Sequence, residues 1–170
     1  MPMRRVLPAL ALLAAPASLA AQGVTSVPAA GFALVGGVSQ YDYSGTGTGL
    51  HLAGRLTRPL TRVVVGEVGI GYMHYDSQGG DRVRMLIPEL QLQLQLPHDR
   101  VSPYLGVGGG VAFSWISDAN EFQPTLSGAA GVRVTVTPLV SFLGELRVRG
   151  VGSDFEGSAA EWTVGVGFRP

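Results

Sequence analysis

The chain has 170 residues, no cysteine, and 12 Lys plus Arg residues against 12 Asp plus Glu residues. The absence of cysteine excludes disulfides, thiolate metal sites and a lipoprotein anchor, and the balanced charge gives no basic surface for nucleic acid. Charged residues make up 14% of the chain, below the roughly 25–35% that is typical of a soluble surface. The composition therefore indicates one domain whose surface mostly faces something other than water.

The N-terminus has the features of an export signal. Arg4 and Arg5 precede a short apolar run over residues 6–15, and small residues at positions 18 and 20 suit a signal peptidase. We predict a cleavable signal peptide over residues 1–21, cut after Ala20 or Ala21, and Sec-type export.

The predicted mature domain, residues 22–170, has 10 Arg, no Lys and 12 Asp plus Glu residues, so its net charge is 10 − 12 = −2. No apolar stretch reaches the length of about 20 residues that a membrane-spanning helix needs. If this domain lies in a membrane, strands must cross it.

Residues 90–96 read Leu-Gln-Leu-Gln-Leu-Gln-Leu. This period of two places four leucines on one face of a strand and three glutamines on the other, whereas a helix would scatter the leucines. Eight segments alternate in this way, at residues 32–41, 50–57, 63–75, 83–96, 104–115, 125–137, 140–149 and 161–168.

The connections between these segments alternate in character. Three are short and contain proline, at residues 58–61, 97–102 and 137–139. Four are mostly longer, acidic and rich in Gly and Ser, at residues 42–49, 76–81, 116–123 and 150–160. An even number of strands with short turns at one end and longer loops at the other is typical of outer-membrane barrels. Both termini would then lie at the short-turn, periplasmic end.

The polar residues of the segments indicate which face is inside. Nearly all mid-strand charges, and the glutamines of residues 91–95, share the face opposite the aliphatic side chains. Large aromatic residues gather near both ends of the aliphatic face, as expected at two membrane interfaces. They are Tyr72, Phe113, Trp115 and Trp162 toward the loops, and Phe32, Phe142 and Phe168 toward the turns. We therefore predict that the aliphatic face meets lipid and the polar face lines the lumen.

With these features, residues 32–168 resemble the small eight-stranded outer-membrane β-barrels of the OmpA/OmpX type. The resemblance implies an all-β, closed, antiparallel up-and-down barrel in the outer membrane of a Gram-negative-type bacterium, without a cofactor. It also implies that the alternating segment ending at Phe168 is a signal for the barrel-assembly machinery, although Arg169 and Pro170 follow the aromatic residue here. The membrane lipid and lipopolysaccharide would be its surroundings.

An eight-stranded barrel is just wide enough to be filled by side chains, so we predict a plugged lumen braced by a charge network. We expect Arg55 with Glu67, and Arg133 with Glu145, to lie near cross-strand register. The four residues should share one height. The complete predicted network is Arg55, Glu67, Glu89, Arg133, Glu145, Arg147 and Arg149. An ion path along these groups is the functional alternative to a structural brace.

Polar residues near the loops carry weaker hypotheses. Arg82 and Arg84 could contact phosphates of the outer-leaflet glycolipid through charge-assisted hydrogen bonds, or could be ordinary rim arginines. The loop carboxylates could bind a divalent cation, but we expect them to keep the loops solvated, and we predict no metal site. They are Asp76, Asp81, Asp118, Glu121, Asp154 and Glu156.

Two sets of residues are candidates for catalysis, and neither supports an enzyme. His74 and Ser77 with Glu89 are weakly similar to the outer-membrane lipid A deacylases, which use Ser, His and Glu. However, the alternation places His74 on the lipid face and Glu89 in the lumen, and a catalytic triad needs its members within hydrogen-bond reach. The other set is Asp42, Ser44 and His51. We predict no catalytic residues.

Three functions thus remain, in decreasing order. The first is a structural or interaction barrel that acts through its acidic extracellular loops, with a partner that the sequence does not name. The second is a narrow pore or a passage for small molecules, and the third is a lipid A-modifying enzyme.

Overall fold

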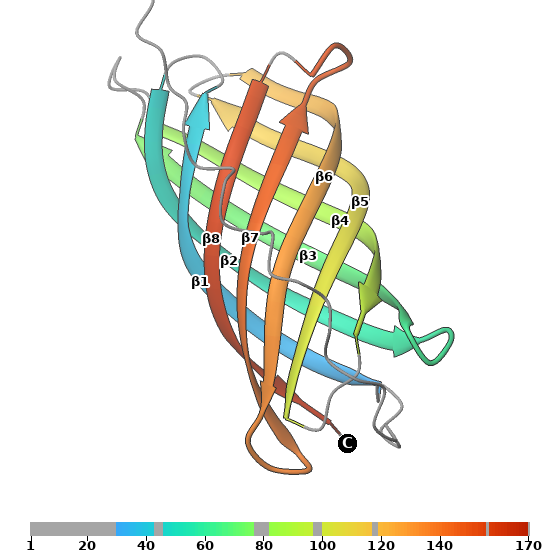
Figure 1. The fold of residues 1–170 in the computed structure, drawn as a ribbon. Coiled ribbons are helices and arrows are strands. Elements are labelled where there is room, and N and C mark those ends of the chain that lie inside the picture. Colours follow the sequence, from blue (N-terminus) through green and yellow to red (C-terminus); the bar gives the residue numbers. More distant parts are fainter. Residues whose placement is uncertain are drawn as a thin grey trace, which may run out of the picture.

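The computed structural model describes residues 30–42, 46–76, 82–96, 100–116, 119–155 and 157–169. Eight antiparallel strands close into one barrel, which confirms the predicted fold class (Figure 1). The strands are β1 (Gly31–Asp42), β2 (Thr46–Pro59), β3 (Val64–Asp76), β4 (Arg82–Gln95), β5 (Val101–Ile116), β6 (Ala119–Thr135), β7 (Val140–Val151) and β8 (Gly157–Phe168). The predicted signal peptide lies outside the described residues.

The described residues contain no helix with the length and apolar character needed to cross a membrane.

The first and last strands close the barrel. Phe32 of β1 lies opposite Phe168 of β8 and opposite Leu56 of β2, so β1 has a partner on both sides. The start of β1 and the end of β8 therefore lie side by side, at the lower end in Figure 1, where the turn from β2 to β3 also lies. We call this the turn end and the opposite end the loop end.

The strands continue further into the loop end than the sequence predicts. β6 begins at Ala119 and β8 at Gly157, so stretches that were expected to be loops pair as strands. Trp115 lies opposite Asn120, and Ser114 lies opposite Glu121. The prediction of loops that are longer than the turns was wrong. Their Gly, Ser and acidic residues disfavour strands intrinsically, but a neighbouring strand that supplies backbone hydrogen bonds overrides this local preference.

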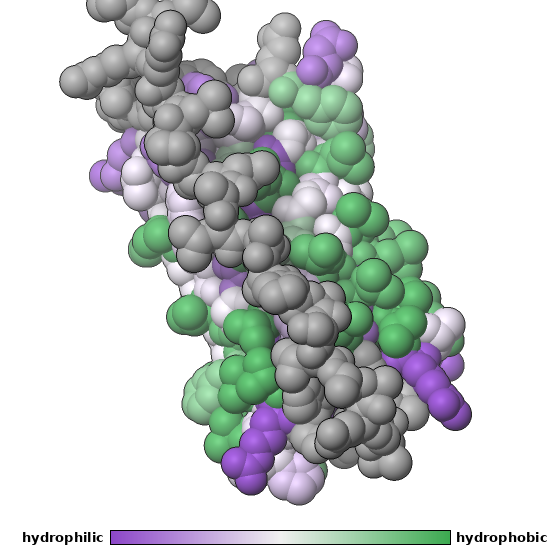
Figure 2. Space-filling model, in the orientation of Figure 1, coloured by the Kyte–Doolittle hydropathy of each residue, from purple (hydrophilic) through white to green (hydrophobic). Residues whose placement is uncertain are grey.

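The aliphatic face is outside, as predicted. Leu90 and Leu92 are 65% and 53% exposed, whereas Gln91 and Gln93 between and beside them are buried. Figure 2 shows hydrophobic residues over much of the wall and hydrophilic residues toward its ends. All of the aromatic residues predicted at the two interfaces are at least one-third exposed, with Phe32 and Phe168 adjacent at the turn end.

The inward side chains form two layers. Toward the turn end they are mostly charged or polar. Toward the loop end they form a buried apolar cluster, which consists of Tyr41, Met73, Tyr75, Val83, Met85, Ile87, Ala112, Val151 and Ala159. The expectation of a polar lumen therefore holds for one half of the barrel, because the alternation that predicts an inward side chain does not fix its polarity.

Candidate functional site

Glu145 on β7 lies buried in the lumen and accepts hydrogen bonds from three side chains. Arg55 on β2 donates from Nη1 to Oε2 and from Nη2 to Oε1, at 2.9 Å each. Tyr104 on β5 donates its hydroxyl to Oε2 at 2.7 Å, and Arg147 donates from Nε to Oε1 at 3.0 Å. One carboxylate thus joins strands β2, β5 and β7 across the lumen.

Arg147, two residues along β7, extends the contacts to β4 and β3. Its Nη1 donates to Glu89 Oε1 and its Nη2 donates to Gln91 Oε1, both at 2.9 Å. The same Nη2 lies 3.6 Å from Glu67 Oε1. A planar guanidinium with several donors suits this position, because it can satisfy three acceptors in fixed directions.

Arg149 continues the contacts toward the loop end. It donates from Nε to Glu161 Oε1 at 2.7 Å, and its Nη1 lies 2.6 Å from Glu89 Oε2. His51 Nδ1 lies 3.3 Å from Glu161 Oε2. Glu161 was not among the predicted network residues, although the alternation with Thr163 in the predicted strand places it on the lumen face. In the structure it is buried and lies in register with Arg147 and Ser39.

Arg55 and Glu67 lie close but are not the main pair. Their nearest atoms are 3.8 Å apart, and Glu67 Oε2 instead accepts a hydrogen bond from Gln93 at 2.9 Å. In the ladder Arg55 lies opposite Gly69, and Glu67 lies opposite Thr57. This offset of two residues, set by the turn, leaves Arg55 free to reach across the lumen.

Arg133 is buried but forms no ion pair with a carboxylate among the described residues. It lies opposite Leu143, while Glu145 lies opposite Gly131. The Tyr104 ring covers Gly131 so closely that a Cβ there would overlap it. Arg133 and Glu145 thus have the same two-residue offset as Arg55 and Glu67, but they do not pair. Glu145 instead binds Arg55, Arg147 and Tyr104, and Tyr104 was not among the predicted network residues.

The lumen is close to electrically neutral along this half. Four arginines and four glutamates point inward, namely Arg55, Arg133, Arg147 and Arg149 with Glu67, Glu89, Glu145 and Glu161. Desolvation makes buried charges costly unless they are paired and hydrogen-bonded, so the close contacts around Glu145 and Arg147 offset that cost.

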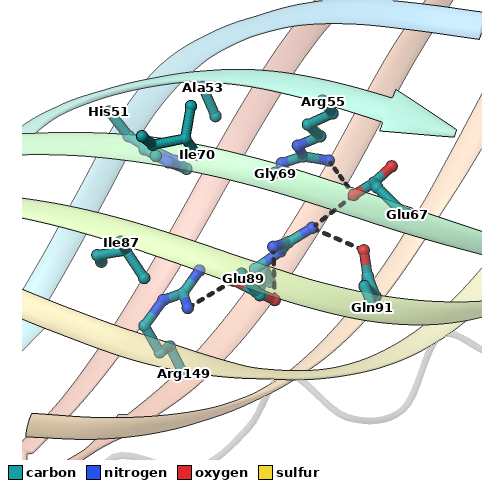
Figure 3. Close-up of a pocket in the computed structure, with 12 residues that line it drawn as sticks. His51, Ala53, Arg55, Glu67, Gly69, Ile70, Ile87, Glu89, Gln91 and Arg149 are labelled. Carbon is teal, nitrogen blue, oxygen red and sulfur yellow. Dashed lines mark hydrogen bonds and ion pairs between the residues drawn. The ribbon is translucent and has the colours of Figure 1, made fainter.

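A small cavity remains within this network. It has a volume of about 10 Å³ and is lined by Arg55, Glu67, Glu89, Arg147 and Arg149, among others (Figure 3). Such a volume accommodates about one water molecule. The charged layer is therefore tightly packed at this level.

Comparisons with known proteins agree with this architecture. The family model described as "Outer membrane protein beta-barrel domain" matches residues 7–169. The chain belongs to this family. It is accordingly an outer-membrane β-barrel protein, as predicted. A comparison with curated proteins found no match.

Several solved structures share the fold of this outer-membrane barrel. Neisserial surface protein A is 15% identical, with a TM-score of 0.69, and the match covers 83% of this chain and 97% of that one. OprG from Pseudomonas aeruginosa is 12% identical, with a TM-score of 0.58 and coverage of 82% and 95%. The outer membrane enzyme PagL is 15% identical, with a TM-score of 0.50 and coverage of 84% and 100%.

The loop-end arginines lie on the outside of the barrel. Arg82 and Arg84 alternate with the buried Val83. Arg82 Nε lies 3.8 Å from Asp76 Oδ1, and both side chains are more than 70% exposed. Arg84 lies opposite His74 on β3 and opposite Trp115 on β5, which places it beside the aromatic residues of the loop-end interface.

The residues weighed as catalytic are not brought together. His74 alternates with the inward Met73 and Tyr75 and so lies on the outer side of the wall, whereas Glu89 is bound to Arg147 in the lumen. His51 lies in the lumen beside Glu161, and Asp42 is exposed at the end of β1. The two candidate serines, at positions 44 and 77, lie outside the described residues.

The described loop-end carboxylates are spread around the rim. Asp76, Glu121 and Asp154 are exposed, and Glu121 accepts a hydrogen bond from Gln123 at 2.9 Å. Among the described residues, no group of three or more His, Cys, Asp or Glu side chains could hold a metal ion. Asp81, Asp118 and Glu156 lie outside the described residues.

Proposed function

We propose that this outer-membrane protein is a closed barrel with a structural or surface-interaction role, which anchors in the membrane and presents its acidic loop end to the exterior. The observation that carries the proposal is the filled lumen. A charged layer around Glu145 and Arg147 is followed by the apolar cluster around Met73, Met85 and Ile87. A charged layer followed by an apolar layer along the barrel favours a closed membrane anchor over a pore.

The two alternative functions lack comparable support. A narrow pore would need a continuous polar path, but the apolar cluster lies above the charged layer. The fold shared with the outer membrane enzyme PagL is compatible with an enzyme. However, His74 and Glu89, the candidates for a lipid A-modifying site, lie on opposite sides of the wall. A fold shared with an enzyme does not transfer its chemistry without the site.

The loop end offers the surface for an external partner. Exposed carboxylates at Asp42, Asp76, Glu121 and Asp154 surround this rim. Such a rim favours a partner with a complementary positive charge, because complementary charge steers association and selects partners.

We also propose that Arg82 and Arg84 contact phosphates of lipopolysaccharide. Both are exposed, on the lipid-facing side, next to the aromatic interface that contains Trp115. Guanidinium groups bind phosphate in a bidentate, charge-assisted way. The last strand, β8, has a separate role in this proposal. The barrel-assembly machinery would recognise its outward residues from Trp162 to Phe168.

Single cysteines test the surface role, because the natural chain has none. Asp154→Cys at the loop end should react with a membrane-impermeant maleimide on intact cells. Leu139→Cys, which is exposed in the turn before β7, should react only after the outer membrane is permeabilised. Labelling of Leu139→Cys and not of Asp154→Cys on intact cells would contradict the proposal.

A further inference from the structure

The two ends of the barrel carry opposite charge. Among the described residues, the turn end has Arg58, Arg62, Arg100 and Arg169 and no carboxylate. The described carboxylates outside the lumen, Asp42, Asp76, Glu121 and Asp154, all lie at the loop end. The turn end therefore presents cations that the described part of the chain does not neutralise.

One of these arginines, Arg58, borders an apolar groove on the lipid-facing wall. The groove has a volume of about 660 Å³ and crosses strands β2 to β6. Its lining continues in register from strand to strand, since Arg58 lies opposite Gly66, Gly66 opposite Leu92, and Leu92 opposite Val107. Its outward apolar side chains are Leu56, Leu60, Val68, Leu90, Leu92, Val107 and Leu126.

Two glycines and one leucine shape this groove. Gly66 and Gly109 form parts of its floor, where the wall has no side chain. Leu60, in the turn after β2, lies over Gly66, because a Cβ there would meet the Leu60 side chain at 3.5 Å. Leu60 is 57% exposed, so the end of the groove that adjoins Arg58 combines a cation with exposed apolar surface.

We propose that this groove binds an anionic phospholipid of the leaflet at the turn end, with the phosphate on Arg58 and an acyl chain along the groove. Arginine binds phosphate oxygens through charge-assisted hydrogen bonds, and an exposed leucine beside a cation is suited to a membrane interface. No ion pair with a described carboxylate competes for Arg58, and Glu67, which also lines the groove, is held in the lumen by Gln93.

A second groove in the wall provides an internal comparison. It has a volume of about 580 Å³, and its outward lining contains Leu94, Leu105, Val132, Gly144 and Leu146. No arginine lines it. Both grooves can therefore accept an acyl chain, but only the groove at Arg58 should select for headgroup charge.

The test is lipid selection by the intact barrel. Protein reconstituted in vesicles with equal amounts of phosphatidylglycerol and phosphatidylcholine is extracted in mild detergent, and the retained lipids are counted by native mass spectrometry. The natural chain should retain more phosphatidylglycerol. Arg58→Gln should lower the ratio of the two lipids about fivefold, which corresponds to about 1 kcal/mol per arginine at an anionic surface. Arg100→Gln removes an exposed arginine of the same end that lines neither groove, and it should leave the ratio unchanged.

Filling the groove tests the acyl-chain part separately. Gly109→Leu should also lower the ratio, and a Cβ at this position has only an ordinary 3.6 Å contact, with Thr125 O. Gly144→Leu fills the uncharged groove, where a Cβ meets Val132 at 3.9 Å, and should leave the ratio unchanged. Unboiled gel mobility in SDS verifies that each variant is folded. Equal retention of both lipids by the natural chain, or an unchanged ratio in Arg58→Gln, would overturn the proposal.

Discussion

Arg55 and Glu145 are 90 residues apart in the chain and form a two-pronged ion pair across the lumen, with both hydrogen bonds at 2.9 Å. The pair connects β2 to β7, which are not neighbours in the barrel. It therefore braces the cross-section in a way that backbone hydrogen bonds between adjacent strands cannot.

This pair should couple strongly in a double-mutant cycle. Arg55→Met and Glu145→Gln should each destabilise the barrel by up to about 3–5 kcal/mol, because each breaks a buried two-pronged ion pair. The remaining neighbours, Arg147 for Glu145 and Glu67 for Arg55, replace it only in part. The double variant should lose clearly less than the sum. The measurement is urea unfolding in lipid vesicles, with Arg55 and Glu67 as the comparison pair, whose 3.8 Å separation predicts weaker coupling. Additive effects for Arg55 and Glu145 would mean that the pair does not interact.

Because the leucines of β4 face lipid, the free-energy cost of replacing one of them with arginine should depend on its depth in the membrane. Leu90→Arg should destabilise insertion by about 2–4 kcal/mol, since the outward residue Leu90 lies closer to the middle of β4 than Leu96 does. Leu96→Arg, at the turn-end boundary of the same strand, should cost about 0–1 kcal/mol. Both leucines are more than half exposed, so a difference in burial within the protein would not explain a difference between the two free-energy costs. Equal costs in vesicle unfolding experiments would contradict the assigned membrane position.

Because Tyr104 packs against Gly131, one added methyl group at position 131 should destabilise the barrel. Gly131→Ala should displace the Tyr104 ring from Glu145 and cost about 1–3 kcal/mol, as overpacking usually does. Gly128→Ala is the matched control on the same strand, because nothing lies within 4 Å of a Cβ there. Its effect should stay within about 0.5 kcal/mol. If both variants unfold at the same urea concentration, Tyr104 does not occupy the assigned place.

The apolar cluster should behave as a true core. Ile87→Ala removes a side chain that is 1% exposed and should cost about 2–5 kcal/mol, because it leaves a cavity among packed side chains. The neighbouring outward residue Leu86 serves as the control. Leu86→Ala should cost less, since lipid fills the vacated space. Thermal unfolding in detergent compares the two, and a larger loss for Leu86→Ala would contradict the assigned facing.

The sequence was sufficient for the strands and their faces but not for the contacts across the lumen. Alternation such as that of residues 90–96 reports local geometry, and it predicted eight strands and an aliphatic exterior correctly. The pairing of Arg55 with Glu145 depends on strand tilt and stagger around the whole barrel, which no local pattern contains. Spacing alone therefore favoured Arg133 as the partner of Glu145.

Similar physical reasons explain why the sequence did not predict the contact of Tyr104 or the longer strands. Tyr104 was recognised as the start of a strand, but its reach to Glu145 needs the empty space at Gly131, on a neighbouring strand. The strand extensions at the loop end, such as the one from Gly157 to Ala160, depend on backbone pairing with β7 and β1. In both cases the deciding contact comes from another strand.

The central claim is that the lumen is closed, and conductance in planar lipid bilayers tests it most directly. The charged layer around Arg147 leaves a cavity of about 10 Å³, and the apolar cluster covers it toward the loop end. Purified, folded protein should therefore give no conductance, or only small and brief openings, in concentrated potassium chloride. Large and steady openings from the natural chain would contradict the closed lumen and make the barrel a pore.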